Sequence, residues 1–168
     1  MFQNLYPKEE WDSAYASEYE RLYQKGYRGI IFDIDNTLVE HGAPATAQAV
    51  ALVERLRGMG FAVCFVSNND KLRVSEFCKP MDAVYIYKAG KPNDKGYEAA
   101  MRLIGTTKEQ TVSVGDQIFT DIWGANRAGV YSVLVKPIGK KEEFQIVLKR
   151  YLEKIVLHFY RKKKKGQC

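Results

Sequence analysis

A short apolar run that ends in two aspartates constrains this 168-residue chain more than any other feature. It reads Arg-Gly-Ile-Ile-Phe-Asp-Ile-Asp-Asn-Thr-Leu over residues 28–38. The stretch Gly29 to Ile34 predicts a strand buried on both faces, because it is too short and too β-branched for a helix. Asp33 and Asp35 would then lie at the carboxyl end, where parallel sheets bind ligands. Paired carboxylates favour a cation as partner; an acidic strand end that caps a turn is the alternative interpretation.

Four more apolar stretches follow the first, and the segments between them are long enough for helices. This alternation predicts an α/β fold in which parallel strands are joined by right-handed crossovers. We therefore expect a three-layer sandwich around a central parallel sheet of five strands. The expected strands are 29–34, 61–66, 83–87, 111–114 and 131–135, and the expected helices are 8–26, 45–59, 70–78, 92–104, 121–128 and 142–160.

Informative polar residues stand directly after several of these strands. Ser67 and Asn68 follow the second strand, Lys91 lies shortly after the third, and Asp116 follows the fourth. The carboxyl ends of parallel strands meet along one edge of a sheet. The sequence therefore predicts that one site contains these residues together with the first pair of aspartates.

The acidic members of this group suit a hard divalent cation. Asp33 and Asp116 offer carboxylate oxygens, and Asp35 can add its backbone carbonyl. Mg²⁺ prefers oxygen ligands in octahedral geometry and is commonly completed by a substrate phosphate. No cluster of His or Cys accompanies these positions in the sequence, which disfavours Zn²⁺. The expected cofactor is Mg²⁺.

The remaining polar residues suit a phosphate. Ser67 and Asn68 offer hydroxyl, amide and backbone donors near the start of a helix, and Lys91 adds a positive charge. Phosphoryl transfer depends mainly on such positioning and charge neutralisation. An aspartate can attack phosphorus and form an aspartyl-phosphate, while a second carboxylate transfers the protons.

These residues, in this order, resemble the motifs of the haloacid dehalogenase (HAD) superfamily of phosphatases. The resemblance covers roughly residues 28–130, and four motifs that each stand at a strand end are together specific. It implies a HAD-like Rossmannoid fold. The motifs are Asp33-Ile-Asp35-Asn-Thr37, Ser67, Lys91 in Gly-Lys-Pro, and Gly115-Asp116-Gln-Ile-Phe-Thr-Asp121.

The resemblance implies a role for each acidic residue. Asp33 would be the nucleophile and Asp35 the general acid and base, a residue that separates phosphatases from dehalogenases in this superfamily. Asp33, Asp116 and the carbonyl of Asp35 would bind Mg²⁺. Asp121 would orient metal-bound water or the lysine, with a helix N-cap as the alternative interpretation.

The same resemblance assigns the other polar residues to the substrate and its surroundings. Ser67 and Lys91 would hold the phosphoryl group. Asn68 is expected beside them, either on the substrate or as a positioning residue, and Asn36 and Thr37 would position the loop.

The spacing of the motifs leaves no room for a cap domain. Between Leu38 and Ser67, and again between Ser67 and Lys91, little more than one helix and one strand fits. Capless HAD phosphatases form subclass IIIA and have open sites, whereas specificity for a small metabolite usually needs an enclosing pocket. An open site favours a large substrate, a partner subunit as lid, or a phosphate on a surface.

Within this subclass the chain resembles the YqeG-type phosphatases, on the Tyr-Pro lead-in, Phe-Asp-Ile-Asp-Asn-Thr-Leu-Val, Ser-Asn-Asn and Gly-Asp-Gln-Ile-Phe-Thr-Asp. That group is similar to phosphatidylglycerophosphate phosphatases, so the resemblance implies a phosphorylated lipid head group as substrate. Two alternatives stay open: a phosphatase of a soluble phosphometabolite or phosphoprotein, and a ribosome- or RNA-associated binding protein with a vestigial site.

The positive charge is concentrated at the carboxyl-terminal end. The chain has a net charge of +6, and residues 136–168 hold 11 Lys or Arg against 3 Glu, whereas the remainder holds 15 against 17 acidic residues. Six apolar residues recur at helical spacing before a run of lysines. A basic amphipathic helix of this kind can lie on an anionic membrane; it can also pack on the sheet with a solvated tail, or bind nucleic acid. The apolar residues are Phe144, Leu148, Tyr151, Leu152, Ile155 and Phe159.

The length predicts one domain over residues 1–168, with a core of about 26–138 and a basic helix and tail of about 141–168. Cys64, Cys78 and Cys168 are too widely spaced for a disulfide framework or a CxxC site; Cys64 is expected in the core and Cys168 to be free. No secretory signal or membrane-spanning segment is predicted. The expected location is the cytoplasm, with peripheral association at the inner face of the membrane.

Overall fold

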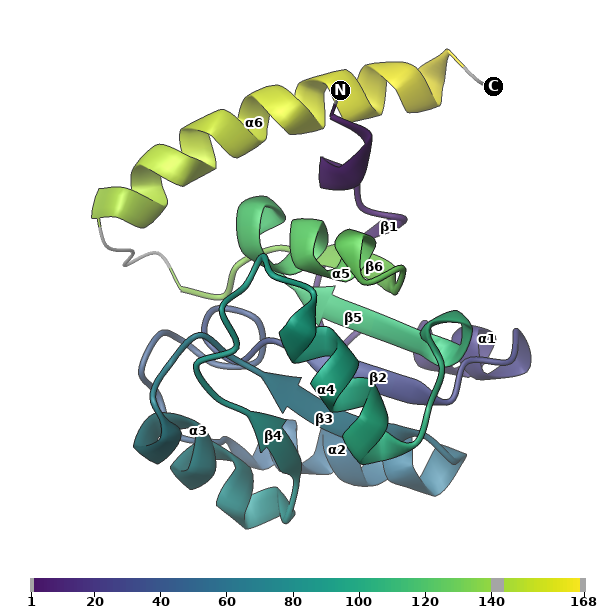
Figure 1. Ribbon diagram of the computed structural model, residues 1–168, viewed down its shortest axis with the longest axis vertical. Helices are drawn as coiled ribbons and strands as arrows, with labels where there is room; N and C mark the ends of the chain where they lie inside the picture. The colour runs from purple at the N-terminus through teal and green to yellow at the C-terminus, as the bar shows by residue number, and fades with distance from the viewer. Residues whose placement is uncertain (1, 140–143, 167–168) are drawn as a thin grey trace.

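The computed structural model describes residues 2–139 and 144–166, and it contains a six-stranded, entirely parallel sheet between two layers of helices (Figure 1). The strand order is β1-β6-β5-β2-β3-β4, so β2 and β5 lie at the centre. The strands are β1 (Glu9–Trp11), β2 (Gly29–Phe32), β3 (Ala62–Val66), β4 (Val84–Ile86), β5 (Thr111–Gly115) and β6 (Tyr131–Val135).

Six α-helices and four shorter turns connect these strands. The α-helices are α1 (Tyr19–Gln24), α2 (Ala47–Met59), α3 (Lys71–Cys78), α4 (Lys95–Ile104), α5 (Trp123–Arg127) and α6 (Phe144–Lys165). Three 3₁₀ turns, η1 (Gln3–Leu5), η2 (Lys79–Met81) and η3 (Lys108–Gln110), and one π-helical turn, η4 (Ile118–Ile122), complete the described chain.

Alternate strand residues pack against the two helical layers. Ile30 and Phe32 belong to the larger apolar cluster, which includes buried residues of α1, α2 and α3. Ile31 points to the other face and packs with residues of α4 and α5. Because β2 is buried on both faces, it fixes the position of the loop that follows it.

The structure corrects the expectation of five strands and of one helix over 8–26. Glu9–Trp11 forms a sixth strand that pairs in parallel with β6, and only Tyr19–Gln24 of this segment is α-helical. A three-residue edge strand has little sequence signal of its own, since its conformation depends on its neighbour. Here Trp11 is buried and its ring packs edge-on against Tyr19.

Glu9 holds this edge of the sheet together. Its carboxylate accepts hydrogen bonds from Arg21 at 2.6 Å, Tyr131 at 2.7 Å and Trp11 at 2.8 Å. Burial alone would raise the pKa of Glu9, but these hydrogen bonds outweigh it and lower the pKa to about 2. A depressed carboxyl pKa stabilises the fold above pH 4.5, and this contribution is lost as the pH falls toward 2.

Replacing Glu9 by Gln is therefore expected to lower the free energy of unfolding at pH 7 by about 1 to 2 kcal/mol. The difference from the unmodified protein should shrink as the pH falls from about 4.5 to 2. Urea unfolding at several pH values measures it, with exposed Glu98→Gln as control. An equal loss of stability at pH 2.5 and pH 7 would contradict the proposed linkage.

The two cysteines that the structure describes, Cys64 and Cys78, are buried. Cys64 thus lies in the core as predicted, and Cys168 is outside the described residues. Between β2 and β3 the described chain contains α2 as its one helix, and between β3 and β4 it contains α3 and η2. These short connections agree with the predicted absence of a cap.

The last helix is longer than predicted and has two different faces. It begins at Phe144 and continues through Lys165, so residues 161–165 are helical instead of a tail. Figure 1 shows α6 lying along the molecule above η4 and α5, with the amino-terminal segment beside its second half. Val156 and Leu157 pack with Ile118 and Leu134 in a third apolar cluster.

The opposite face of α6 carries the predicted apolar stripe. Ile155 is 55% exposed, and the exposed fractions of the other described members lie between 49% and 67%. The side chain of Phe144, predicted to belong to this stripe, is outside the described part of the structure. None of the helices described is both long enough and apolar enough to cross a membrane. The exposed stripe is Leu148, Tyr151, Leu152, Ile155 and Phe159.

Candidate active site

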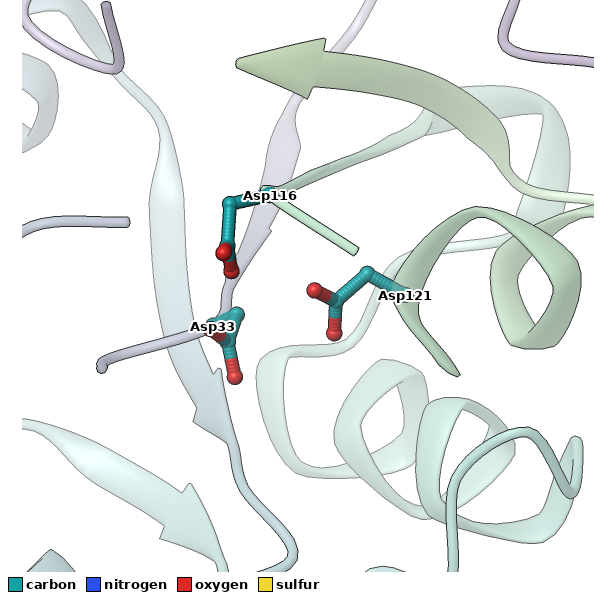
Figure 2. A group of neighbouring side chains, drawn as sticks. All are labelled: Asp33, Asp116 and Asp121. Carbon is teal, nitrogen blue, oxygen red and sulfur yellow. The ribbon is translucent and has the colours of Figure 1, made fainter. Parts of the chain in front are cut away.

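Three aspartates meet at the carboxyl ends of the two central strands. Asp33 follows β2, Asp116 follows β5, and Asp121 lies in η4 (Figure 2). One oxygen from each carboxylate lies within 4.8 Å of the other two. Figure 2 shows the three side chains close together, with the carboxyl group of Asp121 turned toward the other two aspartates. Sheet topology thus brings together residues separated by more than 80 positions in the chain.

Lys91 supplies a positive charge inside this group. Its Nζ donates to Oδ1 of Asp33 and to Oδ1 of Asp121, at 2.6 Å each. Burial alone would lower the pKa of Lys91, but the charges of Asp121 and Asp33 raise it well above its ordinary value. The lysine is therefore held as a cation between two carboxylates.

Asn68 positions the backbone of Lys91. Its amide Nδ2 donates to the carbonyl of Lys91 at 3.1 Å, and the N–H of Lys91 donates to Oδ1 of Asn68 at 2.7 Å. Both ends of the Asn68 side chain are thus bound to the lysine main chain. These two hydrogen bonds place Asn68 beside Lys91, and its predicted role, on the substrate or as a positioning residue, stays a prediction.

The turn after β2 holds the first motif in a strained conformation. Asn36 has a φ of 62°, a left-handed conformation that Asn adopts more readily than most residues. Its backbone N–H donates to Val39 at 2.7 Å, and its Oδ1 is buried without a hydrogen-bond partner among the described residues. Thr37, the next residue, has its hydroxyl 3.0 Å from Asp33 Oδ2 and 3.1 Å from Asp116 Oδ1. This single hydroxyl links the carboxylates that follow β2 and β5.

Asp121 is positioned from two sides, and it is not a helix N-cap. Its backbone carbonyl accepts a hydrogen bond from the buried hydroxyl of Tyr97 at 3.0 Å, and its Oδ2 accepts one from the N–H of Gln117 at 3.1 Å. Gly115 permits the approach, because a Cβ on that residue would lie 2.4 Å from the Cβ of Asp121. The carboxylate of Asp121 contacts Lys91 at 2.6 Å, and its predicted role in orienting the lysine or metal-bound water stays a prediction.

Asp116 is fully buried and is held by an arginine from α6. Arg150 Nη1 donates to the backbone carbonyl of Asp116 at 2.5 Å, and Nη2 donates to Oδ2 of the same residue. Burial and the charges of Asp33 and Asp121 raise the pKa of Asp116 well above its ordinary value, and Arg150 opposes this shift. Burial and Asp121 likewise raise the pKa of Asp33 to about 6, against Lys91 and Thr37.

The carboxylate of Asp35 is bound by residues near the start of α3 and by the loop after β2, and among the described residues it shares no hydrogen-bond donor with the other three aspartates. Its carboxylate accepts from Asn69 Nδ2 at 2.6 Å, the N–H of Gly42 at 2.7 Å and Arg73 Nη2 at 2.8 Å. Ser67, which directly follows β3, is buried, and its hydroxyl accepts a hydrogen bond from the N–H of Asn69 at 3.1 Å. Asn69 thus connects the ends of β2 and β3.

Sequence reasoning missed three residues that contact the aspartates of this site. Arg73 holds Asp35, Tyr97 holds the backbone of Asp121, and Arg150 holds Asp116. Tyr97 and Arg73 lie within helices and carry no motif signal. One sequence pattern could have pointed to Arg150. Together with Glu153 it places charged side chains on the face of α6 opposite the apolar stripe.

The donor set fits a hard divalent cation. Three carboxylates with oxygens within 4.8 Å offer the ligand type that Mg²⁺ prefers. No His or Cys belongs to this cluster among the described residues. Burial and the neighbouring charges of Asp33 and Asp121 raise the pKa of Asp116, as expected where carboxylates lie close together.

Comparison with known proteins identifies similar sequences. A HAD-hydrolase-like family model matches residues 88–149, which include Lys91, Asp116 and Asp121. Over 145 residues the chain is 38% identical to the probable phosphatase YqeG of Bacillus subtilis, covering 86% of this chain and 84% of that protein. It is 30% identical over 158 residues to the chloroplastic/mitochondrial phosphatidylglycerophosphate phosphatase 1 of Arabidopsis thaliana, covering 82% of this chain but 45% of that protein.

Solved structures share the fold. The magnesium-bound HAD-hydrolase YfnB of Bacillus subtilis matches with a TM-score of 0.54 at 14% identity, over 71% of this chain and 91% of that chain. The cobalt-bound deoxy-D-mannose-octulosonate 8-phosphate phosphatase of Haemophilus influenzae matches with a TM-score of 0.51 at 15% identity, over 81% and 90%. At such identities the likeness establishes the fold alone.

Proposed function

Since the chain belongs to the YqeG family of HAD phosphatases, we propose that it hydrolyses phosphomonoesters through an aspartyl-phosphate on Asp33, with Mg²⁺ as cofactor. The observation that carries this proposal is the position of Asp33. Its carboxylate stands at the end of a central strand, 2.6 Å from the Lys91 ammonium and within 4.8 Å of a carboxylate oxygen of Asp116.

In the first step, Asp33 attacks phosphorus, the bond from phosphorus to the substrate oxygen breaks, and Asp35 donates a proton to that oxygen. In the second step, Asp35 accepts a proton from water as the water attacks phosphorus, which releases phosphate and restores Asp33. Ser67 and Lys91 hold the phosphoryl oxygens throughout. Asp121 keeps Lys91 in place through the 2.6 Å contact.

Bound Mg²⁺ would neutralise the negative charge that gathers on the phosphoryl oxygens. Asp33, Asp116 and the backbone carbonyl of Asp35 are the proposed groups that hold it. The hydroxyl of Thr37 fixes the first two relative to each other. Because the described connections from β2 to β3 and from β3 to β4 contain no cap domain, the proposed site would admit a phosphate carried by a large substrate.

We propose a phosphorylated lipid head group as the substrate class, with phosphatidylglycerophosphate as the specific candidate. The similarity to the Arabidopsis phosphatase of that name supports this choice. The exposed apolar stripe of α6 and the lysines at its end support it further, because such a surface suits peripheral binding to an anionic membrane. The stripe and the lysines are thus proposed to bring the open site to its lipid.

Phosphate release from phosphatidylglycerophosphate in mixed vesicles tests this proposal, with Mg²⁺ and with EDTA, beside a panel of soluble phosphate esters and phosphopeptides. We expect Mg²⁺-dependent release that is fastest on the lipid. Faster turnover of a soluble ester would exclude the lipid assignment and leave the phosphatase intact. Co-sedimentation with ribosomes and no hydrolysis of any ester would favour a binding protein instead.

Vesicle sedimentation tests the membrane surface separately. Replacing Ile155 by Asp should lower the bound fraction on vesicles with anionic lipid several-fold, because a charge enters the middle of the apolar stripe. Leu103 of α4 is 54% exposed, close to the 55% of Ile155, so Leu103→Asp is a matched control. Equal binding of both variants and the unmodified protein would rule out this face of α6 as the contact surface.

A further inference from the structure

Helix α6 reaches the active site through two charged side chains that act on opposite ends of one loop. Arg150 holds Asp116 at the beginning of that loop. Glu153 accepts a hydrogen bond through Oε1 from the N–H of Ile118 at 2.8 Å, at the first residue of η4. Arg150 Nη1 lies 3.1 Å from Glu153 Oε2, so the two side chains also hold each other. The segment that carries Asp116 and leads into η4, where Asp121 lies, is therefore fastened to α6.

The contacts of Asp116 differ between its two carboxylate oxygens. Oδ1 lies 3.1 Å from the hydroxyl of Thr37, on the side of Asp33. Oδ2 accepts from Arg150, whose guanidinium also binds the backbone carbonyl of the same residue. A planar guanidinium that binds the carbonyl and Oδ2 together fixes the side-chain rotamer. Oδ1 is thereby kept facing Asp33, where the proposed cation would lie.

We infer that Arg150 is a positioning residue of the active site, which orients Asp116 as a metal ligand, and that α6 is consequently part of the catalytic apparatus. The inference rests on the metal site of the proposed function. Groups that orient metal ligands through hydrogen bonds commonly change metal affinity or activity by about 10- to 100-fold when removed. Without Arg150, the charges of Asp33 and Asp121 would repel the Asp116 carboxylate and turn it away from them.

The neighbouring residues of α6 show that this contact is specific. Lys154, four residues further along, is exposed, and its ammonium lies 5.0 Å from the ring centre of Tyr151 on the same helix. Arg150 instead has a side chain that is 17% exposed and contacts the fully buried carboxylate of Asp116. Lys154 therefore offers a control with the same helix and the same charge change.

Binding of Mn²⁺ to the full chain, followed by the electron paramagnetic resonance signal of free Mn²⁺, tests the inference without requiring turnover. Arg150→Met should raise the Kd for Mn²⁺ about 10- to 100-fold. Arg150→Lys, which keeps the charge but cannot bind the carbonyl and Oδ2 as a fork, should lie between Met and Arg. Lys154→Met should match the unmodified protein. Arg150→Lys also keeps the test valid if the Met variant does not fold.

The possible results separate this inference from the proposed function. If the unmodified protein binds no Mn²⁺, the proposed metal site is wrong and the inference falls with it. If it binds Mn²⁺ and both Arg150 variants bind equally well, the inference alone is wrong. Tighter binding in Arg150→Met would also overturn it, because Arg150 would then compete with the cation for Asp116 instead of orienting the ligand.

Discussion

Replacing Asp33 by Asn should lower kcat by about 10³-fold or more, because it removes the proposed nucleophile while keeping the shape of the side chain. The fold should be preserved. Burial and the charge of Asp121 raise the pKa of Asp33, so the carboxylate is a destabilising charge in this place, and a neutral amide removes it. Lys91 keeps its contact with Asp121 at 2.6 Å.

Phosphate release at saturating substrate measures the loss, and thermal unfolding verifies the fold. Acid-quenched mass spectrometry of the unmodified protein should show a phosphoryl group on the peptide that contains Asp33, and the variant should lack it. Asp82, an exposed residue outside the site, provides the matched Asp→Asn control. Retention of more than a tenth of the turnover in Asp33→Asn would exclude a nucleophilic role.

Replacing Lys91 by Met is expected to impair both stability and activity. The side chain of Lys91 is 4% exposed, and its ammonium lies 2.6 Å from the carboxylates of Asp33 and Asp121. Removing one partner of a buried ion pair leaves an uncompensated charge and costs about 3 to 5 kcal/mol. For a protein of this size we expect the Tm to fall by roughly 10 °C. Activity should be lost as well, since the phosphoryl group loses its positive partner.

The pH dependence of the Lys91 contribution has a definite sign. The pKa of Lys91 is raised in the folded protein, so the stabilisation is fully present below the unfolded value of 10.5 and is lost only as the pH rises beyond it. The defect of Lys91→Met should therefore be complete at pH 7. Adding Mg²⁺ should restore part of the lost Tm by neutralising the carboxylates. Exposed Lys95→Met is the control; a Tm within about 2 °C of the unmodified protein would contradict this account.

Motif residues and central strands could be predicted because their physical requirements are local. Gly29–Phe32 is an apolar run that only a buried strand accommodates, and Asp33 comes directly after it. Parallel topology then places Asp116 and Lys91 beside it, so the site follows from strand order. The same reasoning predicted from sequence alone that Lys91 lies beside the carboxylates of this site.

The remaining features depend on contacts between distant segments. Glu9–Trp11 became a strand because β6 was available to pair with it, and no pattern in three residues indicates this. Arg150 appeared only as one of several charges on a basic helix. Its contact with Asp116 depends on how α6 packs on Ile118 and Leu134, which periodicity does not determine.

The placement of β1 and α6 also has a consequence for synthesis on the ribosome. Glu9 pairs in register with Val133, so one edge of the sheet cannot form until the ribosome has made nearly the whole core. Arg150 is made later still, so Asp116 emerges long before the side chain that balances its charge. The ribosome adds about 5 to 20 residues per second, and domains fold as their chains emerge. The growing chain therefore spends seconds with its central strands and its three aspartates already made, while Asp116 still lacks the contact from Arg150.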